Sequence, residues 1–455
     1  MLLRRLNNLK LKGCVVYALV DGNNFYVSCE RVFRPSLHNA PVVVLSNNDG
    51  CAISRSNEAK SLGIAMGAPW FKIKELEETQ GLVSLSANFA LYGDLSDRMM
   101  SLVAGLGHRQ EIYSIDESFV DVSGIRGDIT QRAFKIRARV LQWVGIPCCV
   151  GIGDTKTLAK LANHIAKTAE RKPGVYPDCY AQVCHLSACT PEQKRLLLQA
   201  TDVSEVWGVG RRISAQLREA GIHTAWDLMH MDLTLARTRW SVVLERTVRE
   251  LQGTPCIDLD DAAPNKKEIA CTRSFGEPIV ALSHLQQAVT EFASRAAEKM
   301  RRQKNCALRV LCFIRTSPFR VKDAQYSRSV VMPLMRATDD SHAIVQAALA
   351  GLSHIYQAGF KYAKAGVMLL DLQPSHWHQH ELQWIDSMLV DSNSDAVKKQ
   401  PLMLAMDQLN TRYGRGTLQI ASAGEQAATK PWAMKQGRRT PDYTTSWDAL
   451  PLARA

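Results

Sequence analysis

The chain has 455 residues, 46% of them hydrophobic, which predicts roughly three or four compact domains and excludes a disordered protein. Its 56 Lys and Arg residues against 44 Asp and Glu residues leave a formal net charge of +12, which favours a polyanionic partner. No apolar run approaches the about 20 residues that span a bilayer, and the N-terminal apolar stretch is too short for a secretory signal. We therefore expect an intracellular protein with no membrane partner.

The first predicted strand is VVYALVD at 15–21, a short apolar run with β-branched residues that ends on Asp21. A buried strand that ends on a carboxylate indicates a functional site, although the following DGNN is also ordinary turn chemistry. From residue 30 to 87 the chain is broken repeatedly by Pro and Gly, which predicts a small module of short helices and strands.

Two adjacent carboxylates, Asp116 and Glu117, interrupt the strand pattern EIYSIDESFVDV at 111–122. Because the alternation continues on both sides of them, the pair is predicted to lie at or near a hairpin turn. If that hairpin neighbours the strand ending on Asp21, three carboxylates converge and require cations. Such a cluster favours two Mg²⁺ ions, the arrangement used in phosphoryl transfer. A solvated hairpin tip is the alternative.

Residues 145–167 predict a strand, a turn and a helix. On that helix Lys156, Lys160 and Lys167 share one face, at spacings of four and seven residues. A lysine stripe is usually a solvated face, and it gains functional meaning only if it points at the carboxylates.

The 12 cysteines are scattered without a Cys-x-x-Cys pair, which indicates reduced thiols rather than a disulfide framework. Four potential metal ligands nevertheless lie close together in the sequence: Cys179, Cys184, His185 and Cys189. Their spacing is not that of a zinc knuckle, so packed thiols are the main interpretation and a metal is the minor alternative.

Residues 203–228 contain the apolar-Gly-apolar-Gly hinge of a helix-hairpin-helix. Gly208 and Gly210 would let backbone N–H groups at a helix N-terminus approach a phosphate, with Arg211 and Arg212 beside them. The pattern favours sequence-independent binding of a DNA backbone over an ordinary helical hairpin.

The stretch 269–372 shows strand and helix periodicities in the order β-α-β-β-α-β, which predicts a separate small domain. A polar, proline-bearing segment at 253–268 precedes it and is interpreted as a linker. Beyond residue 372 the periodicity fades, and 390–400 is predicted to be flexible.

Five ordered motifs carry a resemblance to a known family. They are DGNNFYVSCE (21–30), VVVLSNNDGCAISRSNEAKSLGI (42–64), EIYSIDESFVDV (111–122), VGIGDTKTLAKLANHIAK (150–167) and VWGVGRRIS (206–214). Together they resemble the Y-family translesion DNA polymerases of the UmuC type, which is the catalytic subunit of bacterial DNA polymerase V and includes mobile-element relatives. The likeness runs from about residue 16 to 372 and returns in GRGTL (414–418) and PDYTT (441–445).

The resemblance implies an α+β multidomain protein with the right-hand architecture of a polymerase, including a ferredoxin-like palm. The implied regions are an N-terminal extension (1–15), palm (16–29 and 88–185), small fingers (30–87), a helix-hairpin-helix thumb (186–254), a linker (255–268), a split β-α-β little finger (269–372) and a C-terminal partner-binding region (373–455).

The resemblance also implies roles for individual residues. Asp21, Asp116 and Glu117 would hold two Mg²⁺ ions, with the backbone carbonyl of Gly22 as a further ligand. The implied nucleotide-binding residues are Phe25, Tyr26, Lys60 and Lys167. Tyr26 falls on the steric gate that excludes a ribose 2′-OH, and the alternative is a core tyrosine next to Phe25.

Two positions depart from the family pattern in the fingers. Asn57 and Lys60 stand where relatives often present Tyr and Arg to the triphosphate. A lysine keeps the charge but loses the bidentate fork of arginine, so Lys60 remains a candidate, whereas Asn57 is not expected to take over the role of the tyrosine.

The implied partners are primer-template DNA, dNTPs, a cleaved UmuD-like dimer, a RecA filament and the sliding clamp. For the clamp the chain offers QHELQW at 379–384, in which Gln379, Leu382 and Trp384 form a candidate binding peptide.

The implied function is error-prone DNA synthesis past damaged bases in the SOS response, carried out in the cytoplasm. One alternative is a catalytically silent DNA-binding subunit of a repair complex, against which three unused buried carboxylates would argue because they cost stability. Another is a palm-type nucleotidyl transferase or cyclase that acts on free nucleotides, which would need no elements that grip a duplex.

Overall fold

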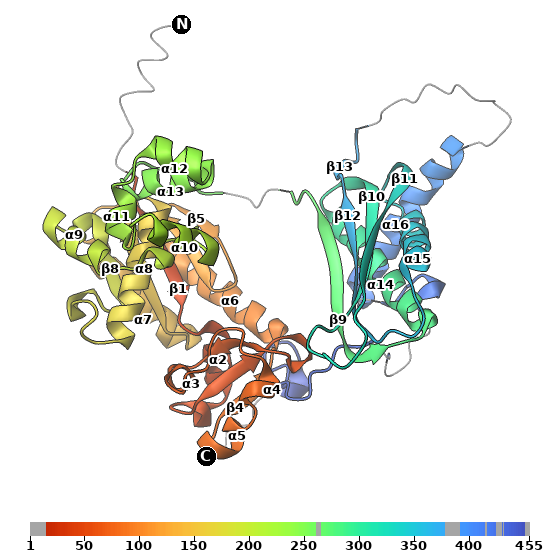
Figure 1. Ribbon diagram of the computed structural model, residues 1–455, viewed down its shortest axis with the longest axis horizontal. Coiled ribbons are helices and arrows are strands. Elements are labelled where there is room, and N and C mark those ends of the chain that lie inside the picture. Colours follow the sequence, from red (N-terminus) through yellow and green to blue (C-terminus); the bar gives the residue numbers. More distant parts are fainter. Residues whose placement is uncertain are drawn as a thin grey trace, which may run out of the picture. The chain divides into compact units, whose positions relative to one another are not determined.

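The structure is a computed structural model that describes residues 15–260, 265–377, 392–414, 416–424, 430 and 432–450. Side chains are not described for residues 392–400. The chain forms two compact units (Figure 1). Unit 1 comprises Met1–Ala263 and Gly437–Ala455, and unit 2 comprises Pro264–Gln436.

A five-stranded sheet forms the centre of unit 1, with the strand order β5-β6-β1-β7-β8. The strands are β1 (Tyr17–Gly22), β5 (Arg109–Ile112), β6 (Glu117–Asp121), β7 (Cys148–Gly153) and β8 (Val183–His185). β1 pairs antiparallel with both β6 and β7, and β8 runs parallel to β7. The first apolar run of the sequence is therefore the central strand.

Helices cover both faces of this sheet (Figure 1). The helices α6 (Phe89–Val103) and α7 (Ile129–Val144) share a core with Ala18 and Val20 of β1. Leu19 points to the opposite face, where α8 (Lys156–Arg171) packs. Because side chains alternate along a strand, Asp21 lies on the α8 face as well.

A second, three-stranded sheet follows α2 (Phe25–Phe33) in unit 1. Its order is β3-β2-β4, with strands Ala52–Arg55 (β3), Val42–Leu45 (β2) and Val83–Ser86 (β4). The short helices of this module are α3 (Asn57–Ser61), α4 (Trp70–Ile73) and α5 (Leu76–Gln80). These are the short elements that the spacing of Pro and Gly predicts for this region.

Five further helices share a hydrophobic core with α8. They are α9 (Pro191–Gln199), α10 (Arg211–Glu219), α11 (Ala225–Met229), α12 (Leu233–Arg239) and α13 (Val242–Leu251). Glu250 of α13 accepts hydrogen bonds from the backbone N–H and the hydroxyl of Thr157, both at 2.9 Å. The start of α8 is thereby fixed to this helical region.

Unit 2 is built on a four-stranded antiparallel sheet with the order β11-β10-β12-β9. Its elements follow one another as β9 (Ile269–Ile279), α14 (Leu282–Arg302), β10 (Asn305–Thr316), β11 (Ser327–Thr338), α15 (Ser341–Ile355) and β12 (Tyr362–Leu370). A short strand, β13 (Gln373–Pro374), pairs with β10. This is the β-α-β-β-α-β order predicted from the sequence, and both helices join the sheet in one core.

The prediction of a flexible segment at 390–400 is wrong, because α16 (Ser392–Tyr413) includes most of it. The Ser, Asn and Asp residues that made this segment look flexible are also common where helices begin. A proline, Pro401, lies inside the helix and obscures its period. An ion pair between Arg301 of α14 and Asp407, with 2.7 Å between Nε and Oδ2, fastens the helix to unit 2.

The chain beyond α16 contributes to both units. Trp432 is fully buried in the core of unit 2, where its ring lies edge-on to Phe292. From Gly437 onward the chain belongs to unit 1.

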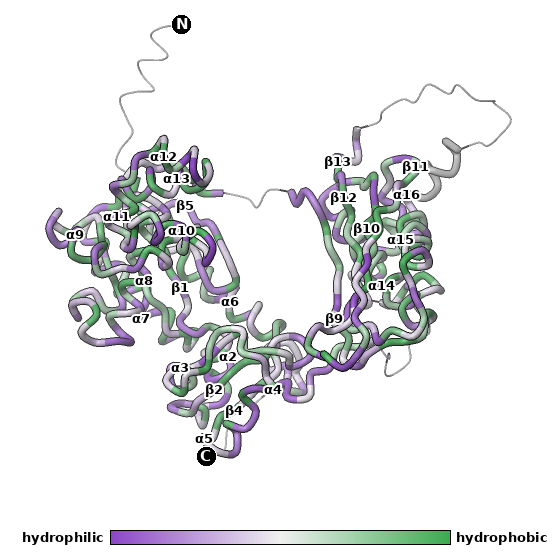
Figure 2. The backbone as a smooth tube through the Cα atoms, in the orientation of Figure 1, coloured by the Kyte–Doolittle hydropathy of each residue, from purple (hydrophilic) through white to green (hydrophobic). Residues whose placement is uncertain are grey.

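Figure 2 shows both hydrophobic and hydrophilic residues along the elements of each unit. None of the described helices is both long enough and apolar enough to cross a membrane.

Candidate active site

Asp21 and Glu117 are register partners in the antiparallel pairing of β1 with β6. Asp116 lies just before β6, in the turn that joins β5 to β6. The backbone N–H of Gly22 donates to the carbonyl oxygen of Asp116 at 2.8 Å, which closes the end of the strand pair. The structure thus brings the three predicted carboxylates to one end of the sheet.

Two lysines of α8 contact these carboxylates. Lys160 Nζ lies 3.0 Å from both carboxylate oxygens of Glu117, and Lys167 Nζ lies 2.5 Å from Asp21 Oδ1. Their side chains are 15% and 31% exposed, so the pairs are partly shielded from water. Lys156 belongs to the same stripe but is buried and paired with Glu111 instead.

Gly151 of β7 allows α8 to approach the sheet this closely. A Cβ at this position would lie 2.1 Å from the backbone nitrogen of Asn163 and 2.2 Å from the carbonyl oxygen of Ala159. Both atoms belong to the backbone of α8, so they have little freedom to move away. The glycine therefore sets the distance at which the lysines of α8 meet the carboxylates.

Asp21 is the most deeply buried member of the group. Burial raises the pKa of Asp21 to about 7, the Lys167 ammonium opposes the shift, and the Glu117 carboxylate adds to it. Asp116 is partly buried, and the hydroxyl of Ser114 donates to its Oδ1 at 2.6 Å. A buried carboxyl beside two others is a group that a cation would stabilise in its charged form.

The residues fit a divalent metal ion by their chemistry, because hard cations such as Mg²⁺ prefer carboxylate and carbonyl oxygens. As the side chains stand, no group of three His, Cys, Asp or Glu residues in the described part of the chain forms a complete metal-binding cluster. The ammonium groups of Lys160 and Lys167 lie against Glu117 and Asp21 and meet their need for positive charge.

A cavity of about 280 Å³ opens beside the carboxylates. The predicted site residues among those that line it are Asp21, Gly22, Phe25, Tyr26, Lys60, Asp116 and Lys167. Of the predicted metal ligands, Asp21, Gly22 and Asp116 line this cavity together with the predicted nucleotide-binding residues, whereas Glu117 lies next to Asp21 across the strand pair and is not part of the lining.

The Tyr26 ring lies on the wall of this cavity. It stacks on the ring of Tyr92, with 4.6 Å between centroids and 15° between planes, and meets Phe89 edge-on at 5.9 Å. Burial raises the pKa of the Tyr26 phenol, and Asp116 adds to the shift. Tyr92 and Phe89 thus support the Tyr26 ring on its faces and edge.

Lys60 reaches the cavity through a polar network. Its Nζ donates to Asn24 Oδ1 at 2.5 Å, and Asn24 Nδ2 donates to Asn57 Oδ1 at 3.1 Å. Burial, followed by repulsion from Arg171, Arg55 and Lys167, lowers the pKa of Lys60 to about 8. Asn57 is therefore linked to Lys60 by hydrogen bonds through Asn24. Asn24 takes a left-handed backbone conformation, with φ 49°.

Arg55 and Asn24 also line the cavity, and neither was predicted as a site residue from the sequence. Arg55 Nη1 donates to the carbonyl of Ile64 at 2.7 Å, while its buried Nε has no hydrogen-bond partner among the described residues. Burial lowers the pKa of Arg55. The signal was the alternation in β3, since Ile53 also lines the cavity and lies two residues before Arg55.

The remaining predicted residues lie elsewhere. Gly208 has φ 91°, a conformation that favours glycine, and Gly210 precedes α10, whose first residues Arg211 and Arg212 are exposed. The candidate clamp peptide, with Gln379, Leu382 and Trp384, lies outside the described residues, as do residues 1–14.

The cysteine group at 179–189 does not form a set of three ligands that could hold a metal ion, as is true of every such group in the described part of the chain. Cys184 is buried and Cys179 is exposed. His185 Nδ1 lies 2.9 Å from the hydroxyl of Thr130, and the Cys189 thiol donates to the carbonyl of His185 at 3.4 Å. Packed thiols account for these contacts.

Comparison with known proteins places the chain in a family. Residues 20–164 match the profile of the impB/mucB/samB family, 266–382 match the C-terminal domain of that family, and 400–453 match a domain of unknown function. UmuC of Salmonella typhimurium is 44% identical over 96% of this chain and 99% of its own length. ImpB of Salmonella typhimurium is 43% identical over 96% of this chain and 100% of its own length.

Other matches have lower sequence identity to this chain. DNA polymerase IV of Corynebacterium diphtheriae is 26% identical over 72% of this chain and 69% of its own length. A chimeric Y-family DNA polymerase that contains Dbh superposes with a TM-score of 0.59 at 17% identity, covering 79% of this chain and 99% of the chimera. By its sequence matches the chain belongs to the impB/mucB/samB family and is of the UmuC type, and its fold is that of a Y-family DNA polymerase.

Proposed function

We propose that the protein extends a DNA primer along a template, including past damaged bases, at the cavity beside Asp21, Asp116 and Glu117. The convergence of carboxylates, cations and a stacked tyrosine around this one cavity carries the proposal. A site for a nucleoside triphosphate needs both positive and negative side chains. Cationic side chains bind the phosphates, and carboxylates hold the metal ions that transfer of the nucleotide requires. Primer extension on undamaged and abasic templates in Mg²⁺ tests the proposal.

The carboxylates and Lys167 have different roles in this reaction. Asp21, Asp116 and Glu117, together with the carbonyl of Gly22, would hold two Mg²⁺ ions, and the bound ions would supply a lower pKa of the primer hydroxyl and stabilisation of the leaving oxygen. Lys167 is then free to leave Asp21 and contact the triphosphate.

The cations on the fingers side of the cavity bind the same triphosphate. Lys60 and Arg55 lie on its wall and repel each other and Lys167, so an anion with several negative charges relieves that repulsion. The small side chains of residues 46–54 leave the nascent base pair loosely covered, which supports error-prone synthesis because a loose cover cannot reject a distorted pair by fit.

We expect Tyr26→Ala to raise the use of ribonucleotides. The phenol ring bounds the cavity and is supported by Tyr92, so its loss opens space for a 2′-OH. Single-nucleotide incorporation with dCTP and rCTP measures the effect. The ratio of kcat/KM for rCTP to kcat/KM for dCTP should rise by about a hundredfold, equivalent to roughly 2.7 kcal/mol. An unchanged ratio would show that Tyr26 is a core residue with no part in sugar selection.

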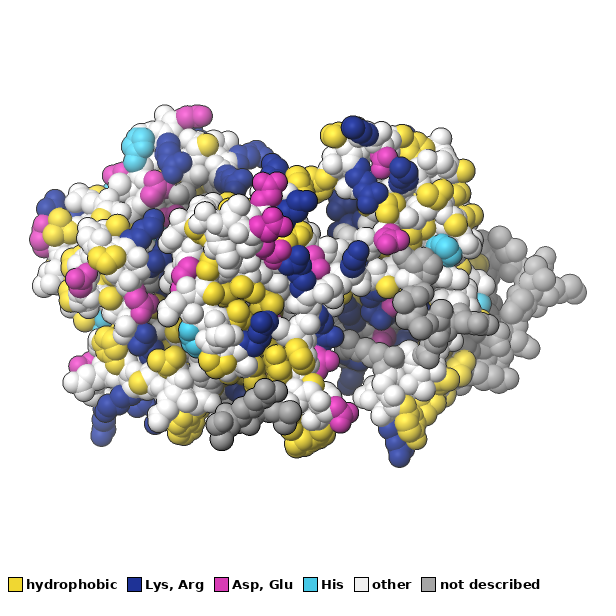
Figure 3. Space-filling model, turned by 90° about the horizontal axis from the view of Figure 1, so that it is seen from below, with side chains coloured by type: hydrophobic (Ala, Val, Ile, Leu, Met, Phe, Trp, Pro, Cys, Tyr) yellow, Lys and Arg dark blue, Asp and Glu magenta, His cyan; other side chains and the backbone are white. Residues whose placement is uncertain are grey.

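The regions of the chain are assigned accordingly. We assign residues 16–29 and 88–185 to the palm, 30–87 to the fingers, 186–254 to the thumb and 269–372 to the little finger. The residues proposed to contact the DNA backbone are Gly208, Gly210, Arg211 and Arg212. Lys and Arg side chains recur over the visible face of the molecule (Figure 3), which supports contact with a polyanion.

Further partners are proposed on the basis of the resemblance to the UmuC type. We propose that the protein works in the cytoplasm during the SOS response with a cleaved UmuD-like dimer, a RecA filament and the sliding clamp. Residues 373–455 are proposed as the partner-binding region.

The clamp contact has a direct test in the peptide at 379–384. We expect replacement of Leu382 and Trp384 by Ala to abolish retention of the protein on immobilised clamp, because clamp peptides bind through apolar anchors. Primer extension without the clamp should be unaffected and serves as the control. If the double variant is retained as well as the wild type, the contact lies elsewhere.

A further inference from the structure

The C-terminal segment Arg438–Tyr443 packs on the helix that carries Tyr26. The ring of Tyr443 stacks on Phe33, the last residue of α2, with 4.8 Å between centroids and 13° between planes. The hydroxyl of Thr440 donates to the Glu30 carboxylate, also on α2, at 3.2 Å. Two side chains from the far end of the sequence therefore fasten the second half of this helix.

Glu30 is the centre of a buried polar network. Its side chain is fully buried, and Oε1 accepts hydrogen bonds from the hydroxyls of Tyr92 at 2.7 Å and Thr440 at 3.2 Å. Oε2 is buried with no hydrogen-bond partner among the described residues. The two hydroxyls thus supply the hydrogen bonds that this carboxylate receives, and the loss of either is costly in a buried site.

Asn88 places Thr440 for this role. The Asn88 amide donates to the hydroxyl and the carbonyl of Thr440, at 3.2 and 3.3 Å, and to the carbonyl of Pro441 at 3.2 Å. Its own Oδ1 caps α6 by accepting from the N–H of Leu91. The C-terminal segment is consequently tied to the start of α6, the helix that carries Tyr92.

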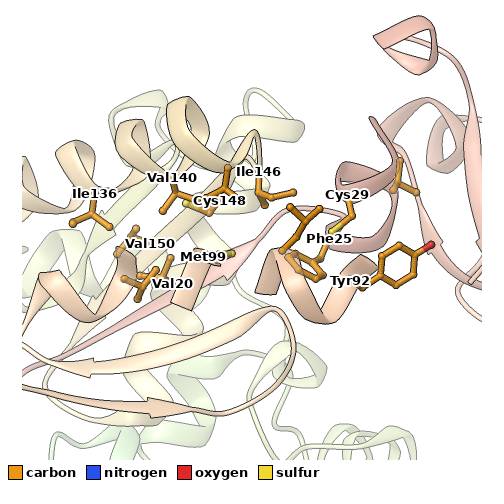
Figure 4. Close-up of a cluster of buried hydrophobic side chains, with 14 of the residues drawn as sticks. Val20, Phe25, Cys29, Tyr92, Met99, Ile136, Val140, Ile146, Cys148 and Val150 are labelled. Carbon is orange, nitrogen blue, oxygen red and sulfur yellow. The ribbon is translucent and has the colours of Figure 1, made fainter. Parts of the chain in front are cut away.

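The network ends at the cavity. Glu30 lies one helical turn after Tyr26 on α2, and the Tyr92 ring is the surface on which Tyr26 stacks. The ring of Tyr92 lies beside Phe25 and Cys29 of α2, with its hydroxyl turned away from them (Figure 4). Thr440, Glu30, Tyr92 and Tyr26 therefore form one continuous series of contacts.

We propose that Thr440 is a positioning residue for Tyr26, so that the C-terminal segment sets how strictly the cavity excludes a ribose. The inference rests on the proposed function, since it requires Tyr26 to select the sugar. It gives a role to part of the region 400–453, which matches a domain of unknown function. Without the Thr440 hydroxyl, Glu30 and Tyr92 lose their fixed arrangement and the ring behind Tyr26 is free to shift.

The test compares variants of the full chain in single-nucleotide incorporation with dCTP and rCTP. Thr440→Val keeps the shape of the side chain and removes the hydroxyl, and Tyr92→Phe keeps the stacked ring and removes the other donor to Glu30. Both should raise the ratio of kcat/KM for rCTP to that for dCTP by about fivefold, the factor expected for one buried hydrogen bond, while kcat with dCTP stays within about twofold of the wild type.

Two variants serve as controls. Thr440→Ser restores the hydroxyl and should restore the wild-type ratio. Thr445→Val makes the same change at an exposed position two residues after this segment and should leave the ratio unchanged.

The outcomes separate this inference from the proposed function. If Tyr26→Ala raises the ratio but Thr440→Val and Tyr92→Phe do not, the inference about Thr440 is wrong, whereas the proposal that Tyr26 excludes a ribose is supported. If Thr440→Val lowers the melting temperature and dCTP extension together without changing the ratio, the role of Thr440 is purely structural and the inference is wrong. If Tyr26→Ala itself leaves the ratio unchanged while dCTP is still incorporated, the gate assignment fails and the inference fails with it, whereas the polymerase activity stands.

Discussion

Asp116→Asn is expected to lower the rate of nucleotide incorporation by about a thousandfold, equivalent to roughly 4 kcal/mol of lost transition-state stabilisation. The change keeps the size of the side chain and an oxygen that can accept from Ser114, but removes the charge beside Asp21 and Glu117. Single-turnover primer extension in Mg²⁺ measures the effect. Affinity for primer-template DNA should be unchanged, because the residues proposed to contact the DNA backbone, which include Arg211 and Arg212, lie elsewhere in the sequence.

A matched variant shows whether the loss is specific to the site. Asp97→Asn makes the same change on the exposed side of α6, where the carboxylate has no ion pair among the described residues, and should extend primers as the wild type does. Extension by Asp116→Asn at the wild-type rate would remove Asp116 from the site. If neither wild type nor variant extends a primer despite tight DNA binding, even with an accessory dimer and activated RecA, the protein is a silent DNA-binding subunit.

The order of elements around this site was predictable from local patterns. The apolar run that ends on Asp21 and the alternation around Glu117 give two strands, and the order of elements in 269–372 gives unit 2. The sequence did not show that these two strands are neighbours, so the pairing of Asp21 with Glu117 could only be assumed. Register between strands about 95 residues apart depends on the whole sheet, which no local pattern contains.

Contacts made by distant segments explain what the sequence analysis missed. Thr440 and Glu30 are 410 residues apart, and neither has a neighbour in sequence that signals the other. Arg55 alternates with Ile53 on a short strand, but that alternation does not say which face of the strand the folded module turns toward the cavity. The three lysines of α8 also could not be told apart from the sequence, because they share one helix face. Their surroundings differ only in the folded protein.

Lys156 shows this difference most clearly. Its side chain is 2% exposed and forms an ion pair with Glu111, whereas Lys160 and Lys167 are partly exposed and pair with Glu117 and Asp21. Lys156 Nζ also donates to the carbonyl of Asp258 at 2.7 Å, and Glu111 accepts from the N–H of Asp260 at 2.9 Å. The chain that returns after α13 therefore covers the first turn of α8 and turns a predicted surface lysine into a buried one.

Lys156→Met is accordingly expected to lower the free energy of unfolding of unit 1 by about 3–5 kcal/mol. Methionine fills most of the space but leaves the Glu111 carboxylate buried without its cation, and removal of one member of a buried pair costs far more than removal of both. Amide hydrogen exchange of α8 measures the effect, since amides in a core helix exchange through opening of the surrounding unit.

Two further variants decide whether the buried charge is the cause. Lys135→Met, on the exposed face of α7, should change the free energy by less than about 0.5 kcal/mol. The double variant Glu111→Leu with Lys156→Met removes both charges and should recover most of the lost stability. If Lys156→Met costs less than about 1 kcal/mol, or if the double variant is no more stable than the single one, then the pair is not a buried electrostatic contact. In that case α8 is held against the sheet by apolar packing alone, and the positions of Lys160 and Lys167 beside the carboxylates depend on the close approach at Gly151 rather than on Lys156.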